Sequence, residues 1–197
     1  MSSEAKNLMV SSGNETLRCA QGDKGGTMTT KLYWIEGPWP GRLAILPRPR
    51  GGEWLEDEVQ SWQQSGLDVV LSLLTQEEIA DLALTREAEL CQVYGVQFLS
   101  FPIEDRGTPA SRRATLYLVR KLEKALTEGK SLAIHCRQGI GRSALIAACL
   151  LVIAGVDPET ALWRVSEARG CSVPETAEQR EWIREFAREL PTPIPHQ

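Results

Sequence analysis

Apolar runs and longer helix-like segments alternate along the chain, with turn residues between them. Short β-prone runs predict strands at residues 31–35, 43–46, 67–74, 96–103 and 131–135. Helical spacing and capping signals predict helices at residues 53–65, 75 onward, 85–94, 111–128, 142–154, 159–168 and 175–190. Strands that alternate with helices predict an α/β protein: a three-layer sandwich in which helices flank a central, mostly parallel sheet.

Two local patterns give more detail on the helices expected in the N-terminal half of the chain. Thr75 and Glu78 stand at the spacing of a capping box, which fixes a helix start. Trp54 and Trp62 lie on the helix expected at residues 53–65, where core and edge packing is a better interpretation than a ligand site.

The helix expected at residues 111–128 is amphipathic. Its apolar face is predicted to contain Leu116, Val119, Leu122 and Leu126. Its more polar positions carry Arg112, Arg113, Arg120, Lys121 and Lys124. A solvated face is the usual explanation for such a basic set, and attraction of acidic phosphopeptides is the alternative.

The nine residues from His135 to Ser143 read HCRQGIGRS, and they join an apolar strand to an apolar helix. A strand, a tight glycine loop and a helix start together aim backbone N–H groups at an anion. The thiolate is the reactive form of cysteine, and a helix N-terminus stabilises such an anion. Cys136 is therefore the candidate nucleophile, although a lone buried cysteine in a helix-forming region is usually inert core.

The other residues of this motif suit the same chemistry. Gly139 and Gly141 permit positive φ and a close approach of backbone to ligand, and the planar fork of Arg142 holds two phosphoryl oxygens at once. Ser143 is expected to cap the next helix or to donate a hydrogen bond to the departing sulfur. His135 is expected to order the loop by hydrogen bonding rather than to act as a base. The expected phosphate-binding residues are Arg137, Gln138, Gly139, Ile140, Gly141 and Arg142.

At these residues the chain resembles the cysteine-dependent protein phosphatases, whose signature is HCxxGxxR followed by Ser or Thr, and it is most similar to their compact dual-specificity group. The resemblance extends over residues 30–190 and implies the fold of the protein tyrosine phosphatases. It also implies a general acid in the loop segment 101–109, which reads FPIEDRGTP. By this resemblance the acid is Asp105. Glu104 is the alternative acid, and turn capping is the alternative role of Asp105.

Several phosphatases of this superfamily place the hydrolytic water with a glutamine of a C-terminal helix. The loose match here is Gln179, for which a solvated helix face is the preferred expectation. The loop interior, residues 137–141, has no lysine, unlike relatives that act on inositol lipids, so the resemblance disfavours lipid and inositol substrates.

Composition narrows the setting. Against 22 Lys and Arg there are 26 Asp and Glu, and a net charge of −4 favours neither nucleic acid nor an anionic membrane surface as a partner. The five cysteines, at positions 19, 91, 136, 149 and 171, include no CxxC pair. We therefore expect no zinc site or disulfide framework, but reduced thiols in the cytoplasm. No metal or other cofactor is expected, and of the oligomeric states a monomer is favoured.

One domain is expected at residues 29–190, with a flexible segment at 1–28 and an irregular tail at 191–197. The first segment lacks the apolar stretch of a signal peptide. The longest apolar run, residues 144–154, is too short to cross a bilayer.

Together these features predict a phosphomonoester hydrolase that acts on phosphoproteins, at phosphotyrosine, phosphoserine or phosphothreonine, through a cysteinyl-phosphate. Two alternatives stay open: a non-catalytic phosphate-binding module of the same fold, and a thiol enzyme like rhodanese or arsenate reductase. The sequence does not identify which cysteine, of Cys91, Cys149 and Cys171, would form a disulfide with an oxidised Cys136.

Overall fold

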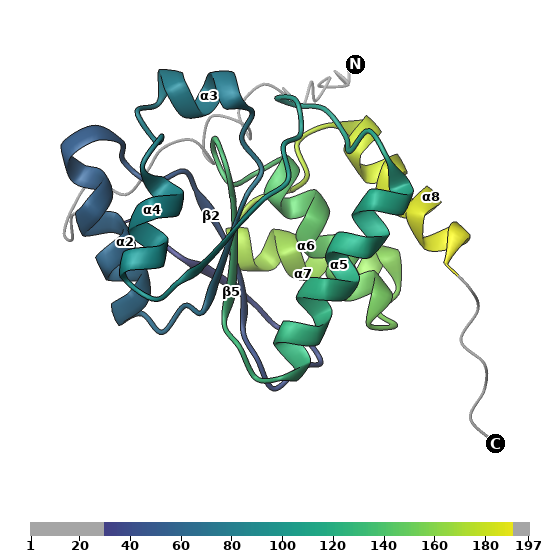
Figure 1. Ribbon diagram of the computed structural model, residues 1–197. Helices are drawn as coiled ribbons and strands as arrows, with labels where there is room; N and C mark the ends of the chain where they lie inside the picture. The colour runs from purple at the N-terminus through teal and green to yellow at the C-terminus, as the bar shows by residue number, and fades with distance from the viewer. Residues whose placement is uncertain (1–29, 191–197) are drawn as a thin grey trace, which may run out of the picture.

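The computed structural model describes residues 30–190, which form a five-stranded sheet with helices on both faces (Figure 1). The strands are β1 (Tyr33–Ile35), β2 (Leu43–Pro47), β3 (Val69–Ser72), β4 (Gln97–Ser100) and β5 (Leu132–Cys136). Their order across the sheet is β1-β2-β5-β3-β4. Only β1 runs antiparallel to its neighbour, and the other three pairings are parallel.

The helices form the two outer layers. One face of the sheet carries the short 3-10 helix η1 (Gly52–Trp54), α2 (Leu55–Gln64) and α4 (Glu87–Val93), and α3 (Gln76–Asp81) follows the end of β3. The other face carries α5 (Arg112–Thr127), α6 (Arg142–Ile153), α7 (Pro158–Arg169) and α8 (Ala177–Glu189) (Figure 1). The expected α/β sandwich with a mostly parallel sheet is confirmed.

Alternate residues of the central strands supply two separate cores. Val69 and Leu71 of β3 join the core beneath α5–α8, whereas Val70 joins the core beneath α2 and α4. Strand β5 does the same, because Ile134 faces the first core and Ala133 the second. A parallel strand covered on both faces needs apolar residues at every position, which explains the near-continuous apolar runs in the sequence.

Helix α6 is the most deeply buried element. It packs against β2 and β5 and is covered by α5, α7 and α8. Every residue from Arg142 to Val152 is buried, so this helix has no polar face. Because α6 begins directly after the loop that follows β5, the buried helix fixes one end of this loop to the core.

Two sequence expectations, about the end of β4 and the buried face of α5, need correction. The strand expected at residues 96–103 ends at Ser100, because Pro102 has no N–H and the chain there becomes an irregular loop. The buried face of α5 also contains Thr115 and Leu118, whereas Leu116 is only half-buried. The Thr75–Glu78 capping box is confirmed, with both of its reciprocal hydrogen bonds present.

The role expected for the two tryptophans is also confirmed. Trp62 is buried in the core beneath α2 and α4, and Trp54 lies at the edge with the Arg50 guanidinium 5.0 Å from its ring centre. No helix described between residues 30 and 190 has the length and apolar character needed to cross a membrane.

A matched pair of valines tests the core. Val165 of α7 is fully buried, whereas Val93 of α4 is 69% exposed. Val165→Ala should lower the free energy of unfolding by about 2 kcal/mol, because it removes buried methyl groups and leaves a cavity. Val93→Ala should change it by less than about 0.5 kcal/mol. Urea unfolding followed by circular dichroism measures both values, and equal effects would contradict this packing.

Candidate active site

The loop between β5 and α6 holds the candidate nucleophile at its base. Cys136 is the last residue of β5 and is buried. Its Sγ accepts a hydrogen bond from the Gly139 amide at 3.3 Å and lies 3.5 Å from the Ser143 Oγ. Ser143 does not cap α6, whose N-cap position is Gly141. The capping role expected for Ser143 is therefore wrong, whereas its expected contact with the sulfur is present.

Two glycines let this loop pack tightly against its supports. Gly139 has a φ of +69°, and a Cβ there would lie 2.7 Å from the Leu46 carbonyl carbon at the end of β2. A Cβ on Gly141 would lie 2.7 Å from a carboxylate oxygen of Glu175. The Arg169 side chain of α7 donates to the Gly139 carbonyl at 3.2 Å. Backbone atoms therefore leave no room for a side chain at Gly139, whereas a side chain at Gly141 would require Glu175 to move.

Arg142 is the most heavily bonded side chain of the site. It is 1% exposed, and its two terminal nitrogens grip the Glu78 carboxylate, with Nη1 at 2.6 Å and Nη2 at 2.8 Å. Nη1 also donates to the carbonyls of Ile103 at 2.8 Å and Leu73 at 3.4 Å. Nη2 donates to the Asp105 carboxylate at 2.9 Å. Fork-to-fork pairing of this kind fixes both the position and the plane of the guanidinium.

Arg142 and Glu78 each stabilise the charged form of the other. Burial opposes the charge of Arg142, but its hydrogen bond to Glu78 and its electrostatic interactions with Cys136, Glu78 and Asp105 hold its pKa above the ordinary value. Burial likewise opposes the charge of Glu78, but the hydrogen bonds and charge of Arg142 and the Thr75 amide lower its pKa. Both groups therefore stay ionised around neutral pH.

Asp105 lies on the loop between β4 and α5, and its side chain is 55% exposed. Its carboxylate reaches Arg142, and the structure thus brings the candidate acid, arginine and thiol to one place. The neighbouring Glu104 is exposed and makes no hydrogen bond to a residue of the loop 136–142. Of these two carboxylates, that of Asp105 is the one hydrogen-bonded to Arg142.

His135 precedes the thiol and is fully buried. Its Nε2 lies 2.8 Å from the Glu87 carboxylate of α4, which is also buried, and its ring centre lies 6.3 Å from that of Trp62. The contact has the distance of an ion pair, although its angles are not those of a hydrogen bond. His135 thus anchors the end of β5 to the α2–α4 layer, beneath the loop.

The loop and its neighbours enclose a cavity of about 260 Å³. Three guanidinium groups, of Arg106, Arg137 and Arg142, and two carboxylates, of Asp105 and Glu175, line it. Gln138, Ile140 and Gly141 complete the loop side, and Ile140 is buried. The cavity therefore offers an excess of positive charge within an acidic protein, as an anion site requires.

Sequence reasoning missed the site role of two acidic residues. The capping box singles out Glu78 in the sequence, but it predicts only hydrogen bonds within α3 and not a contact with Arg142. Glu175 had none, because it lies in an irregular segment that reaches the cavity only when α7 and α8 have packed.

The solvated position expected for Gln179 is wrong. Gln179 is fully buried at the start of α8, and its Nε2 donates to the Gly107 carbonyl at 2.9 Å. A Cβ on Gly141 would lie 3.2 Å from its side-chain amide atoms. The side chain therefore lies between the acid loop and the loop that holds Cys136.

The other cysteines in the described range do not line this cavity. Burial, with the charge of Glu87, raises the pKa of Cys91 to about 12, and burial also raises the pKa of Cys149. Both are therefore held as thiols. Cys171 is disulfide-bonded, which contradicts the expectation that all cysteines are reduced. Within residues 30–190 no group of three or more His, Cys, Asp or Glu is arranged to hold a metal ion.

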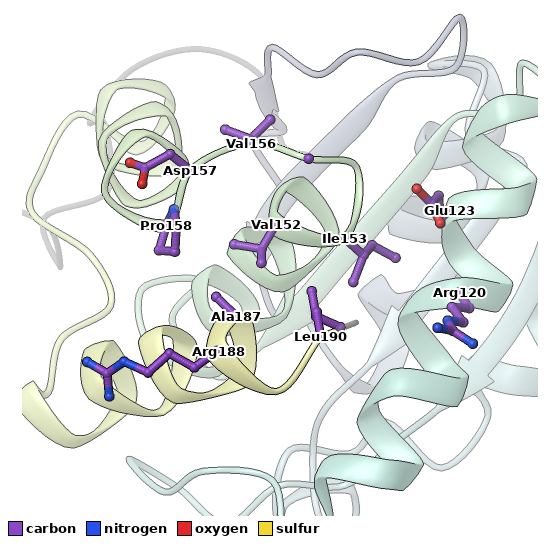
Figure 2. Close-up of a pocket in the computed structure, with 11 residues that line it drawn as sticks. Arg120, Glu123, Val152, Ile153, Val156, Asp157, Pro158, Ala187, Arg188 and Leu190 are labelled. Atoms are coloured by element: carbon purple, nitrogen blue, oxygen red, sulfur yellow. The ribbon is translucent and has the colours of Figure 1, made fainter. Parts of the chain in front are cut away.

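A larger hollow, of about 620 Å³, lies at the opposite end of α6 (Figure 2). Val152 and Ile153 form its floor, and Leu190 and the α5 side chains Arg120 and Glu123 surround it. No residue of the loop 136–142 lines this hollow. Of these two hollows, the smaller one is lined by both Cys136 and Arg142, and the larger by neither.

The fold and this loop are those of the compact, cysteine-dependent, dual-specificity phosphatase family. Residues 30–190 match the family model PTP-SAK, described as Swiss Army Knife protein, DSP-PTPase phosphatase domain. The chain belongs to this family.

Similar proteins agree with this assignment. The chain is 28% identical over 138 residues to cyclin-dependent kinase inhibitor 3 of Rattus norvegicus, covering 69% of this chain and 65% of that protein. It thus spans just under two thirds of that relative. The structure of kinase associated phosphatase with its catalytic cysteine replaced by serine has a TM-score of 0.76 at 22% identity, covering 83% of this chain and 97% of that one. The structure of Tk-PTP in its active form has a TM-score of 0.67 at 28% identity, covering 81% and 97%.

Glu78→Gln tests the buried ion pair. Near neutral pH it should lower the free energy of unfolding by about 3 kcal/mol, because it removes the buried, bidentate carboxylate that offsets the Arg142 charge. The pKa of Glu78 is lowered by folding, so its contribution is complete above the ordinary value of 4.5 and is lost as the pH falls through the folded value.

The stability difference between the wild type and Glu78→Gln should therefore shrink in acid, as urea unfolding at a series of pH values would show. The matched control is Glu77→Gln, one residue earlier and exposed, which should have little effect at any pH. A difference that grows on acidification would contradict the assigned ion pair.

Proposed function

We propose that this chain hydrolyses phosphomonoesters of phosphoproteins, at phosphotyrosine, phosphoserine or phosphothreonine, through a cysteinyl-phosphate. One observation carries the proposal: the Cys136 Sγ lies at the base of a glycine loop, with the buried guanidinium of Arg142 and the carboxylate of Asp105 at the same cavity. Family membership and the phosphatase fold of its neighbours support it.

Arg142 and the loop bind the phosphoryl group. Glu78 occupies one side of the guanidinium, and Nε has no hydrogen-bond partner among the described residues. The Nε and Nη2 edge is therefore the part of the fork left for two phosphoryl oxygens once Asp105 moves from Nη2. The loop residues 137–141 supply backbone N–H groups for the remaining charge, which spreads over the equatorial oxygens in the transition state.

The chemical steps use the thiol and the acid in turn. The Cys136 thiolate attacks phosphorus in line and forms a sulfur–phosphorus bond, while the bond to the leaving oxygen breaks. Asp105, protonated, gives its proton to that oxygen. Water then attacks the cysteinyl-phosphate, with Asp105 accepting a proton, and Ser143 donates a hydrogen bond to the departing sulfur at the contact now 3.5 Å long.

The bond between Asp105 and Arg142 describes the resting state. In this arrangement the carboxylate occupies a donor that phosphate needs. Binding of the phosphate dianion would displace the carboxylate toward the leaving group. Gln179, buried between the acid loop and Gly141, is the candidate to orient the attacking water.

The wider setting is part of the same proposal. We take residues 29–190 as one phosphatase domain; the segments assigned as flexible at 1–28 and irregular at 191–197 lie outside the described residues. A cytoplasmic location suits the Cys136 nucleophile, which must stay reduced, whereas the disulfide of Cys171 is more typical of an oxidising compartment. The charge on Arg142 and the loop amides would stabilise the phosphoryl oxygens, a role that metal ions have in other phosphatases. The expected partner is a phosphorylated protein, bound by a monomer.

Cys136→Ser should bind phosphopeptide but lose turnover by roughly a thousandfold or more, because the hydroxyl is a far poorer nucleophile at neutral pH. Initial rates with an aryl phosphate and a phosphotyrosine peptide measure this. Cys91→Ala is the matched control, since Cys91 is a buried thiol away from the cavity, and it should keep its rate. Normal turnover by the serine variant would leave a different nucleophile as the only explanation.

Asp105→Asn should slow hydrolysis of phosphoserine peptides by about 10²- to 10⁴-fold, because their leaving alkoxide needs a proton. An aryl phosphate with an activated leaving group should lose much less. Glu104→Gln, on the adjacent exposed residue, is the control and should leave both rates unchanged. If the Glu104 variant were instead the impaired one, the acid would be misassigned.

A further inference from the structure

An apolar groove of about 530 Å³ runs between β4 and α5. Leu99 and Phe101 form its sheet side, and Ala114, Tyr117 and Leu118 form its helix side. Tyr117 is 76% exposed, the highest value among the large apolar side chains described. An exposed aromatic residue beside buried and half-buried apolar side chains gives a ligand an apolar surface to contact.

The groove is edged by positive charge. Arg113, Tyr117 and Lys121 follow one another at intervals of four residues, so they form a single row along α5 that borders the groove. Neither Arg113 nor Lys121 makes an ion pair within residues 30–190, and no acidic residue lines the groove. By contrast, Arg112 on the same helix is paired with Glu185 and Glu189. The groove therefore complements a ligand that is both apolar and acidic.

The sheet side of the groove is also a free edge. Strand β4 is the last of the five strands, and the amides of Gln97 and Phe101 donate to carbonyls of the β3 segment. Because backbone groups alternate along a strand, the N–H and C=O groups of Phe98 and Ser100 point away from β3. Unpaired edges of this kind bind extended segments by strand addition.

The groove is joined directly to the catalytic apparatus. Its two sides, the end of β4 and the first half of α5, are the two stems of the loop that carries Asp105. A ligand that bridges these sides would hold the stems together. Occupancy of the groove is thus coupled by the chain itself to the position of the candidate acid.

We propose that this groove docks an extended segment of the phosphoprotein substrate that carries acidic and apolar residues. The inference rests on the proposed phosphatase function and adds to it a substrate class. The row from Arg113 to Lys121 spans about 12 Å of helix, which matches about four residues of extended peptide. Apolar side chains contact Leu99, Phe101 and Tyr117, and carboxylates pair with Arg113 and Lys121 at the two ends.

The test uses the full chain and two phosphotyrosine peptides joined by the same Gly-Ser linker to different four-residue segments, one of alternating Glu and Leu and one of alternating Lys and Ser. The acidic, apolar segment should raise kcat/KM about tenfold. Arg113→Glu with Lys121→Glu should abolish this preference, and so should Tyr117→Ser. All three positions are exposed, so these variants should fold and keep the wild-type rate on a small aryl phosphate.

The matched control is Lys124→Glu, which changes the same kind of charge on the same helix outside the groove and should keep the preference. Equal kcat/KM for the two tethered peptides, or equal loss in the Lys124 control, would overturn the proposal. So would Tyr117-dependent binding to phosphatidylserine vesicles or Tyr117-dependent self-association in light scattering, because each would assign the groove another occupant.

The two proposals fail in different ways. If the wild type hydrolyses neither the aryl phosphate nor the peptides, the phosphatase function fails. Binding of the fluorescent Glu-Leu segment alone, followed by anisotropy in the wild type and the Arg113→Glu, Lys121→Glu variant, then still tests the groove. Binding that is equal in both proteins would overturn the groove assignment whatever the catalytic result.

Discussion

The buried charge of Arg142 is the constraint on which the site depends. A guanidinium removed from water must have its donors satisfied, and here the partners come from separate parts of the chain. Glu78 of α3 holds one side of the fork, and the carbonyls of Leu73 and Ile103 accept from Nη1. These contacts position α3 and the start of the acid loop relative to α6. The same bonds leave the outer edge of the guanidinium facing the cavity.

The parallel sheet places the reacting groups at a common end. Cys136 ends β5 in the middle of the sheet, and the loop with Asp105 follows β4 at the edge. In open α/β sheets, ligands bind beyond the carboxyl ends of the strands, because there the loops of several strands converge. The buried pair of His135 and Glu87 secures the central strand from the opposite face, so the thiol is held from both layers.

Much of this arrangement is predictable from local sequence. The motif from His135 to Ser143 is contiguous, so one reading of the chain identifies the thiol, the glycines and the arginine together. The capping box of Thr75 and Glu78 is likewise local, and the wholly apolar α6 indicates a helix buried on all sides. The alternation of strands and helices along the sequence is enough to predict the fold class.

What the sequence could not predict depends on contacts between distant residues. The Glu78 carboxylate meets Arg142 across 64 positions, and nothing in its local pattern distinguishes it from a solvated capping residue. Gln179 was expected in solvent because the residues around it are polar, but docking of α8 against the acid loop buries it. The boundary of β4 has a local cause by contrast, because Pro102 has no N–H and the regular strand ends at Ser100.

One carboxylate serves both a surface helix and the phosphate site. The Glu78 Oε2 accepts from the Thr75 amide, which closes the first turn of α3, and from the Arg142 guanidinium. A helix of six residues has little stability of its own, so fraying of α3 would free the side of the guanidinium that Glu78 holds. The rate at which the α3 amide hydrogens exchange with deuterium therefore reports how firmly Glu78 holds the arginine when an oxyanion enters or leaves the cavity.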